Sequence, residues 1–219
     1  LKPVPRPAEF CGTCHKVHLP EALNKYKWLR GQNHYDSFLL SGVSGHGVQS
    51  FYYPPEAIKN CAACHMPLIE SEDFGAIPSD GSLSVHGHHF PAANTALAHI
   101  FGLADDVNKA HREMLEGALR LDIFGVREGS DIDAPLIAPI DSVVPALTPG
   151  ATYLVDVVIR SLRVGHLFTE GTADSNQVWL ELLIEQNGRI IGSSGLLNSS
   201  DGSLDPWSHM VNAYVLDRQ

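Results

Sequence analysis

All four cysteines of the chain lie in two pentapeptides of one pattern, Cys11-Gly12-Thr13-Cys14-His15 and Cys61-Ala62-Ala63-Cys64-His65. The pattern C-x-x-C-H is typical of c-type haem attachment, in which two thiols form thioethers to the porphyrin and the adjoining histidine binds the iron. Two matches that leave no cysteine over indicate two covalently bound haems. The expected thioether residues and proximal iron ligands are Cys11, Cys14, Cys61 and Cys64, and His15 and His65.

Three other uses of paired cysteines fit these motifs less well than haem attachment. A four-cysteine zinc site usually separates its two pairs by about 15–20 residues, whereas Cys14 and Cys61 lie much further apart. A thioredoxin-like redox motif accounts for one pair but not for two. Two structural disulfides fit the even count, yet a disulfide across C-x-x-C closes a small loop and restricts the unfolded chain little. Only haem attachment also explains the histidine after each pair.

The second ligand of each iron decides its chemistry, because a haem with one histidine can bind small molecules and a second histidine closes it. His46 lies between two glycines, which let the backbone approach a planar ring, although such a histidine also suits a surface turn. His88 belongs to the cluster His86-Gly87-His88-His89, in which at least one histidine is expected to be a spectator. His46 and His88 are the first candidates for distal ligands.

Three further histidines are alternatives for these positions. His34 is the first of these. His18 lies too near the first attachment motif to reach the opposite face of the haem bound there, so it is better placed to bind a neighbouring haem. His166 stands in the histidine-poor half of the chain, either as a rim residue or as a ligand to a haem that the two motifs do not account for. The remaining isolated histidines are expected to be structural, namely His99, His111 and His209.

Methionine is the competing distal ligand. Met66 directly follows His65 and is barred from the opposite face of that haem, while Met114 and Met210 fit apolar patterns. The sequence therefore favours two bis-histidine, low-spin haems.

Composition limits the class of protein. The chain has 219 residues, 44% of them hydrophobic and 18% charged, which suits one large or two small globular domains. No apolar run reaches the roughly 18 residues of a membrane span. The net charge of −10 argues against nucleic acid or anionic lipid as a partner. The Pro-rich start, residues 1–7, is not a signal peptide, so we expect a mature product or a fragment.

Charge and histidine are unevenly distributed. Residues 1–100 hold 7 Lys and Arg, 8 Asp and Glu and nine of the twelve histidines. Residues 101–219 hold 8 Lys and Arg but 17 Asp and Glu. This contrast predicts a c-type haem-binding domain at 1–125 and a β-sandwich domain at 126–219. The chain stops within a few residues of its last predicted strand, which leaves open a truncated sandwich.

The expected fold is a multidomain α+β protein, with a mostly irregular and α-helical dihaem domain before an antiparallel, Ig-like sandwich. Short helices are predicted at 20–29, 34–40, 94–102 and 105–121 from apolar spacing. After Gly125 the apolar pattern changes to alternation. Strands are predicted at 136–140, 142–146, 153–160, 178–184, 190–191 and 213–216. Asn187-Gly188 predicts a tight hairpin because both residues tolerate positive φ.

Three stretches resemble the multihaem c-type cytochromes related to the tetrahaem cytochromes of nitrifying bacteria. The first runs from Trp28-Leu29-Arg30-Gly31-Gln32-Asn33 to Ser44-Gly45-His46, and the second joins Cys64-His65-Met66-Pro67 to Gly87-His88-His89-Phe90-Pro91 and Asn94-Thr95-Ala96-Leu97. The third, Gly165-His166-Leu167-Phe168 with Val178-Trp179-Leu180-Glu181, is similar to the signature of a β-sandwich appended to many members.

The resemblance implies that His46 and His88 are distal ligands and that the chain carries electrons. Ala92 stands where glycine is common in the family and Thr169 where proline is usual. Members typically carry four or more haems, whereas this chain has two attachment motifs, so further haems are expected in partners or in a missing portion.

Electron transfer between redox proteins or haem-bearing subunits is therefore the expected function. One alternative is a structural or electron-relay subunit of a larger membrane redox or photosynthetic complex, or of a cytochrome filament. The other is a multihaem oxidoreductase with an open iron, for which the sequence gives no specific sign. Because thioether attachment takes place on the outer side of an energised membrane, we expect an exported protein, periplasmic or extracellular.

Overall fold

The computed structural model describes residues 8–51, 54–171, 173 and 176–211, which divide into two compact units. Unit 1 holds residues 38–165, and unit 2 holds Ala8–Ser37 together with the described residues from His166 onwards. Each unit contains one of the two C-x-x-C-H motifs. The predicted boundary between residues 125 and 126 lies within a strand of unit 1.

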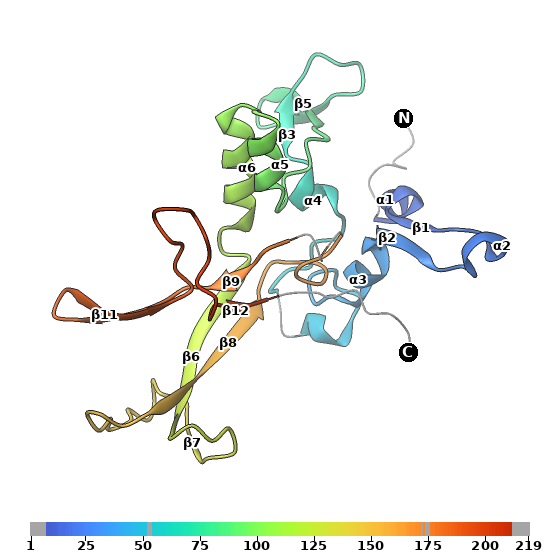
Figure 1. Ribbon diagram of the computed structural model, residues 1–219. Coiled ribbons are helices and arrows are strands. Elements are labelled where there is room, and N and C mark those ends of the chain that lie inside the picture. The colour runs from blue at the N-terminus through green and yellow to red at the C-terminus, as the bar shows by residue number, and fades with distance from the viewer. Residues whose placement is uncertain (1–7, 52–53, 172, 174–175, 212–219) are drawn as a thin grey trace. The chain divides into compact units, whose positions relative to one another are not determined.

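Short helices and short strands follow one another along the chain (Figure 1). The helices are α1 (Ala8–His15), α2 (Glu21–Asn24), α3 (His34–Leu40), the 3-10 helix η1 (Val48–Phe51), α4 (Ala62–His65), α5 (Thr95–Ile100) and α6 (Asp105–Leu115). The strands are β1 (Lys16–His18), β2 (Trp28–Asn33), β3 (Leu68–Glu70), β4 (Ile77–Ser79), β5 (Ser82–His86), β6 (Leu119–Glu128), β7 (Leu136–Ile137), β8 (Tyr153–Ser161), β9 (Trp179–Leu180), β10 (Leu182–Gln186), β11 (Arg189–Ser194) and β12 (His209–Met210). This mixture belongs to the expected α+β class.

Unit 1 contains two three-stranded antiparallel sheets, ordered β3-β5-β4 and β7-β6-β8. Helix α6 ends before Gly117, whose φ of 68° is a left-handed conformation that suits glycine and stops a helix. The chain then enters β6, which pairs with β8 from Leu119↔Ser161 to Glu128↔Tyr153. The loop between the two sheets contains α5 and α6, which lie side by side in Figure 1.

The β7-β6-β8 sheet has one apolar and one charged face. Cross-strand pairing places Leu121 opposite Ile159 and Ile123 opposite Val157, so these four side chains share a face. Arg120, Asp122 and Arg160 share the other face, where Asp122 forms ion pairs of 2.9 and 2.6 Å with the two arginines. Leu121 and Ile123 are nevertheless 57% and 51% exposed. The apolar face therefore has a surface that a further layer could cover.

Unit 2 contains three two-stranded antiparallel sheets, β1-β2, β9-β12 and β10-β11. The predicted hairpin is confirmed, because Gln186 pairs with Arg189 across a turn in which Asn187 and Gly188 have φ of 50° and 74°. Both strands of this hairpin carry exposed apolar residues, among them Ile184 and Ile191. A two-stranded hairpin is only marginally stable by itself, so it depends on contacts beyond its own ladder.

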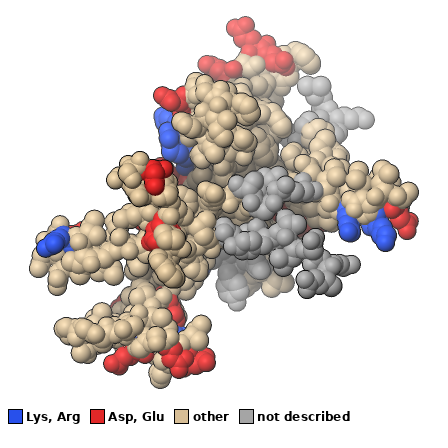
Figure 2. All heavy atoms as spheres, viewed as in Figure 1, with Lys and Arg blue, Asp and Glu red and all other residues tan. Residues whose placement is uncertain are grey.

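Few side chains are buried in the described parts of the chain, and none of the large ones is fully buried. The buried apolar residues are mostly small, namely Ala8, Phe38, Val43, Ala62, Ala98, Ala118 and Val126. On the face that Figure 2 shows, most of the described surface is neither acidic nor basic. Within the described ranges, no helix is long and apolar enough to cross a membrane.

The predicted elements are partly right. Helix α3 and strand β8 lie where they were expected, and α5 nearly so. The helix predicted at 20–29 was wrong beyond Asn24, because Trp28 begins β2, and the helix predicted at 105–121 ends at Leu115. Residues 142–146 form no strand, and the strand predicted at 213–216 lies outside the described residues. The small β3-β5-β4 sheet was not predicted from the sequence.

Gly195 is the glycine whose replacement the fold tolerates least. Its φ is 81°, and an added Cβ would lie 2.0 Å from the Leu180 carbonyl oxygen. We expect Gly195→Ala to lower the free energy of unfolding by more than about 2 kcal/mol, since strain and a backbone clash add together. Gly202→Ala is the matched control, because φ is 70° there and a Cβ meets nothing within 4 Å. Equal losses in urea unfolding of the two variants would contradict this account.

Candidate functional site

Each C-x-x-C-H motif lies on a helical turn. The first ends α1, and the second occupies α4 with Cys61 as the residue before it. At the second motif, the backbone N–H groups of Cys64 and His65 donate to the Cys61 carbonyl at 3.2 and 3.0 Å. Residues three and four apart share one face of a helix. The first cysteine of each motif is therefore a neighbour, on the helix surface, of both the second cysteine and the histidine.

The four cysteines are thiols, and no disulfide joins either pair. Burial raises the pKa of the Cys64 thiol, and the Arg163 guanidinium opposes this shift only in part. A thiol whose pKa is raised is protonated at neutral pH, so Cys64 is a neutral thiol here.

His65 is oriented by its neighbours in unit 1. Its Nδ1 lies 2.9 Å from the Pro91 carbonyl oxygen, which can only accept, so Nδ1 carries the proton. The lone pair of the neutral ring then lies on Nε2, which is the arrangement commonly found in metal-binding histidines. The Phe90 ring stacks on the imidazole, with centroids 4.4 Å apart and planes 6° apart. The direction of the His65 ring is thus fixed by a hydrogen bond and by packing.

His88 and His46 both lie in unit 1 with the second motif. The His88 ring is exposed and stands 5.6 Å from the Phe90 ring, on the segment that also contacts His65. His46 is exposed in the turn after α3, where its N–H donates to the Ser44 hydroxyl at 3.2 Å. The structure therefore brings His88 to the neighbourhood of His65 through Phe90, and it places His46 on a surface turn anchored by buried Ser44.

Three histidines of unit 2 form a chain of ring contacts. The His15 and His34 centroids are 5.6 Å apart, and those of His34 and His166 are 6.4 Å apart, both edge-on. Two imidazoles that bind one metal ion from opposite sides, each at about 2.0–2.1 Å, have centroids roughly 6 Å apart. The first motif therefore has one candidate partner in contact with its histidine, His34, and His166 contacts His34 in turn. Both were alternatives in the sequence, ranked after His46 and His88.

His166 is held by a buried carboxylate. Its Nδ1 lies 2.9 Å from the Leu167 carbonyl oxygen and 3.2 Å from Glu170 Oε2. The Glu170 side chain is 12% exposed and accepts a hydrogen bond from the Ser37 hydroxyl. Burial raises the pKa of Glu170, while the Ser37 hydrogen bond and the charge of His166 lower it. Glu170 Oε2 forms no hydrogen bond among the described residues, so its contact with His166 Nδ1 is an ion-pair contact.

His18 has a different environment in unit 2. Its ring makes edge-on contacts with Tyr26 and Trp28 at 5.3 and 5.4 Å, and its Nδ1 lies 3.1 Å from the Leu19 carbonyl oxygen. These contacts belong to the β1-β2 ribbon. They give His18 an aromatic neighbourhood rather than a place in the His15, His34 and His166 chain.

The sequence did not indicate a role for His111. This histidine is 7% exposed on α6, and its Nδ1 contacts both the N–H and the carbonyl oxygen of Ala92, at 2.9 and 3.0 Å. Its only signal in the sequence was a histidine at an apolar position of a predicted helix. That signal is equally typical of a structural residue.

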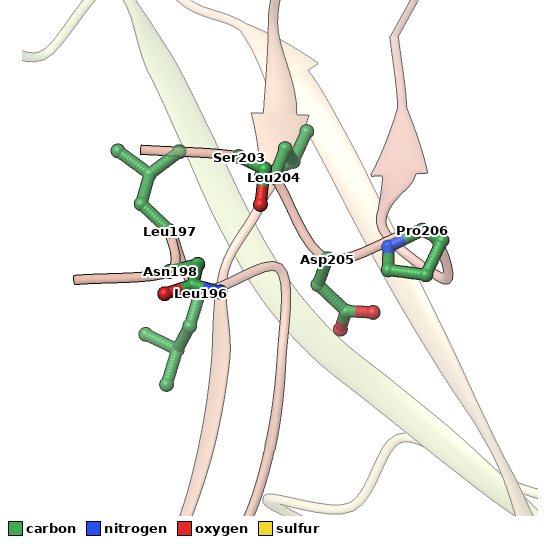
Figure 3. A pocket seen from close by; sticks show the side chains of 7 residues that line it. All are labelled: Leu196, Leu197, Asn198, Ser203, Leu204, Asp205 and Pro206. Carbon is green, nitrogen blue, oxygen red and sulfur yellow. The ribbon is translucent and has the colours of Figure 1, made fainter. Parts of the chain in front are cut away.

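The described residues contain no group of three or more His, Cys, Asp or Glu arranged to hold a metal ion. A haem iron needs at most two protein ligands, so this finding bears on zinc-type sites and not on haem. The pocket in Figure 3 has a volume of about 240 Å³ and is lined by leucines, Asn198, Ser203, Asp205 and Pro206. It contains neither histidine nor cysteine, and it is smaller than usual ligand sites.

Ser37 offers a test of the His166 and Glu170 arrangement. We expect Ser37→Ala to destabilise the protein by about 1–3 kcal/mol at neutral pH, because a buried carboxylate loses a donor. The hydroxyl stabilises the charged form of Glu170, so the loss shrinks as the pH falls and Glu170 takes up a proton. Thermal melting at neutral and acidic pH measures both effects. Ser142→Ala, whose hydroxyl has a weak 3.4 Å bond to exposed Asp141, is the control; a pH-independent or negligible loss would contradict the arrangement.

Comparison of the chain with protein-family models, with curated proteins and with solved structures finds no match. The functional interpretation therefore depends on the two motifs and on the contacts of their histidines.

Proposed function

We propose that the chain is an electron-transfer cytochrome with two covalently bound c-type haems, one at each motif, whose irons are bis-histidine and low-spin. The haem would supply the redox chemistry, while the chain fixes its ligation, burial and orientation. The residues proposed to hold one haem in unit 2 are Cys11, Cys14 and His15. Those proposed to hold the other haem in unit 1 are Cys61, Cys64 and His65.

One observation carries the proposal. His65 ends the helical turn that carries both thiols of its motif, and its Nδ1 donates to the Pro91 carbonyl oxygen. That bond directs Nε2 towards a metal and makes the imidazole a stronger electron donor. A structural disulfide or a thioredoxin-like pair needs neither the histidine nor its orientation.

The distal ligands are proposed separately for each unit. In unit 1, His88 is our first choice because Phe90 links it to His65, and His46 is the alternative. In unit 2, His34 is preferred to His18 because its ring contacts that of His15, and His166 is the next candidate because its ring contacts His34. Closing both irons with histidine would make small-molecule catalysis unfavourable and leave electron relay as the function.

Partners and compartment follow from the cofactor proposal. Thioether attachment would make this an exported protein of the periplasm or the cell exterior, and its partners other redox proteins or haem-bearing subunits. The net charge of −10 disfavours nucleic acid. We also propose that the β7-β6-β8 sheet is one layer of an antiparallel β-sandwich, because a sheet with one apolar face is stable when a second layer covers that face.

A relay subunit of a larger redox complex is the second candidate function. It is favoured by the exposed apolar side chains of the β10-β11 hairpin and of β6, because monomeric proteins rarely expose contiguous apolar patches. Co-purification of the exported protein with other haem proteins would support this candidate, and a stable monomer would favour the independent carrier.

The cofactor proposal predicts the mass of the chain after export. The wild-type protein, measured under denaturing conditions, should exceed its peptide mass by two haems and give a c-type reduced haemochrome spectrum. The double variants Cys11→Ser/Cys14→Ser and Cys61→Ser/Cys64→Ser should each retain one haem, since thioethers are lost at one motif only. A wild-type mass equal to the peptide alone would contradict the proposal.

Ferric spectra test the distal ligands. We expect His88→Ala to convert roughly half of the iron to a high-spin form that binds cyanide, because one of two closed sites opens. The adjacent exposed His89→Ala is the matched control and should stay low-spin. If His88→Ala stays low-spin and His46→Ala opens the site, the distal ligand of unit 1 is His46. The same comparison of His34→Ala and His166→Ala with His18→Ala identifies the ligand in unit 2.

A further inference from the structure

We propose that His111 is a positioning residue for His65, acting through the single peptide unit that joins Pro91 to Ala92. This inference rests on the proposed function, because the orientation of His65 matters most when it binds an iron. It assigns a role to a histidine that the sequence marked only as structural.

Opposite ends of one peptide plane face the two histidines. The Pro91 carbonyl oxygen accepts from His65 Nδ1 at 2.9 Å, and the Ala92 N–H donates to His111 Nδ1 at 2.9 Å. A peptide unit is planar and rigid. The position of His111 therefore fixes the direction in which the Pro91 carbonyl meets the His65 ring.

The two hydrogen bonds also strengthen each other. A donated Ala92 N–H polarises its peptide group, which makes the Pro91 oxygen a better acceptor. A better acceptor draws the Nδ1 proton of His65 more strongly and raises the basicity of its Nε2. His111 Nδ1 also lies 3.0 Å from the Ala92 carbonyl oxygen. In the tautomer with the proton on Nδ1, His111 would therefore donate to that oxygen and still contact Ala92.

The local backbone needs such a restraint. Phe90 has a φ of 51°, a left-handed conformation that bulky residues seldom adopt and that surrounding contacts must maintain. Pro91 is half-buried, and Ala92, two residues after Phe90, is held by buried His111 on helix α6. This restraint keeps the Phe90 ring stacked on His65 as well as the carbonyl in place.

The test compares His111→Asn with His111→Gln in the exported, haem-loaded protein. The Asn side-chain oxygen can occupy the place of Nδ1 and accept the Ala92 N–H, whereas the Gln oxygen lies one bond further out. His111→Leu removes the acceptor altogether, and His99→Leu at an exposed position of α5 is the matched control. Haem content by mass is determined for every variant before its redox titration.

We expect His111→Leu and His111→Gln to change one of the two titrating components and leave the other unchanged. Weaker donation by His65 favours reduced iron, so the ratio of oxidised to reduced form at the wild-type midpoint should fall at least about threefold. His111→Asn should restore the wild-type ratio, and His99→Leu should not change it. Exchange of the Ala92 amide hydrogen should accelerate in the Leu and Gln variants but not in Asn.

Unchanged titration and unchanged Ala92 exchange in His111→Gln would overturn the inference. Equal changes in the redox titration and in Ala92 exchange for His111→Asn and His111→Gln would also overturn the inference. In a purely structural role, the placement of the side-chain oxygen in Asn would not restore the wild-type values. If His111→Leu fails to fold, the comparison of His111→Asn with His111→Gln tests the inference by itself, because both variants carry a carboxamide side chain. A wild-type protein without covalent haem would instead refute the proposed function, and the Ala92 exchange would still test the His111 contact.

Discussion

The scarcity of buried apolar side chains is the constraint on which the rest of this structure depends. Among the described residues no large side chain is fully buried, and the buried set consists mainly of alanines and valines. Burial of apolar surface is the dominant favourable term in folding, so a structure with so few buried apolar side chains needs another source of it. Two porphyrins, each attached by a helical turn and packed against nearby rings, would supply that surface in the proposed cytochrome.

The same constraint explains why each unit is organised around a motif. In unit 1 the strands of the β3-β5-β4 sheet connect α4 to the segment that contains His88, Phe90 and Pro91, and α6 holds that segment in place. In unit 2 the β1-β2 ribbon follows α1 directly and leads to His34 at the start of α3. In the proposed cytochrome, these elements would bring histidines to the attached haems rather than build a large apolar core.

The sequence could predict the features that depend on neighbouring residues. The Asn187-Gly188 hairpin, helix α3 and strand β8 are of this kind. It failed where distant pairing decides the structure: Trp28 lies in a strand because it pairs with His18, and β5 exists because it pairs with strands on both sides. The grouping of His34 and His166 with His15, and the contact of His111 with Ala92, involve residues far apart in the chain, so no local pattern indicates them.

The central claim is that an iron porphyrin lies at each motif, bound by His15 in unit 2 and by His65 in unit 1. Anomalous diffraction at the iron absorption edge, from crystals of the exported protein, measures this most directly. The account predicts two iron peaks, each about 2 Å from the Nε2 atom of one of these histidines, with continuous density from the porphyrin to both cysteines of the motif. A map without iron at the motifs, or with each cysteine pair closed into a disulfide, would contradict it.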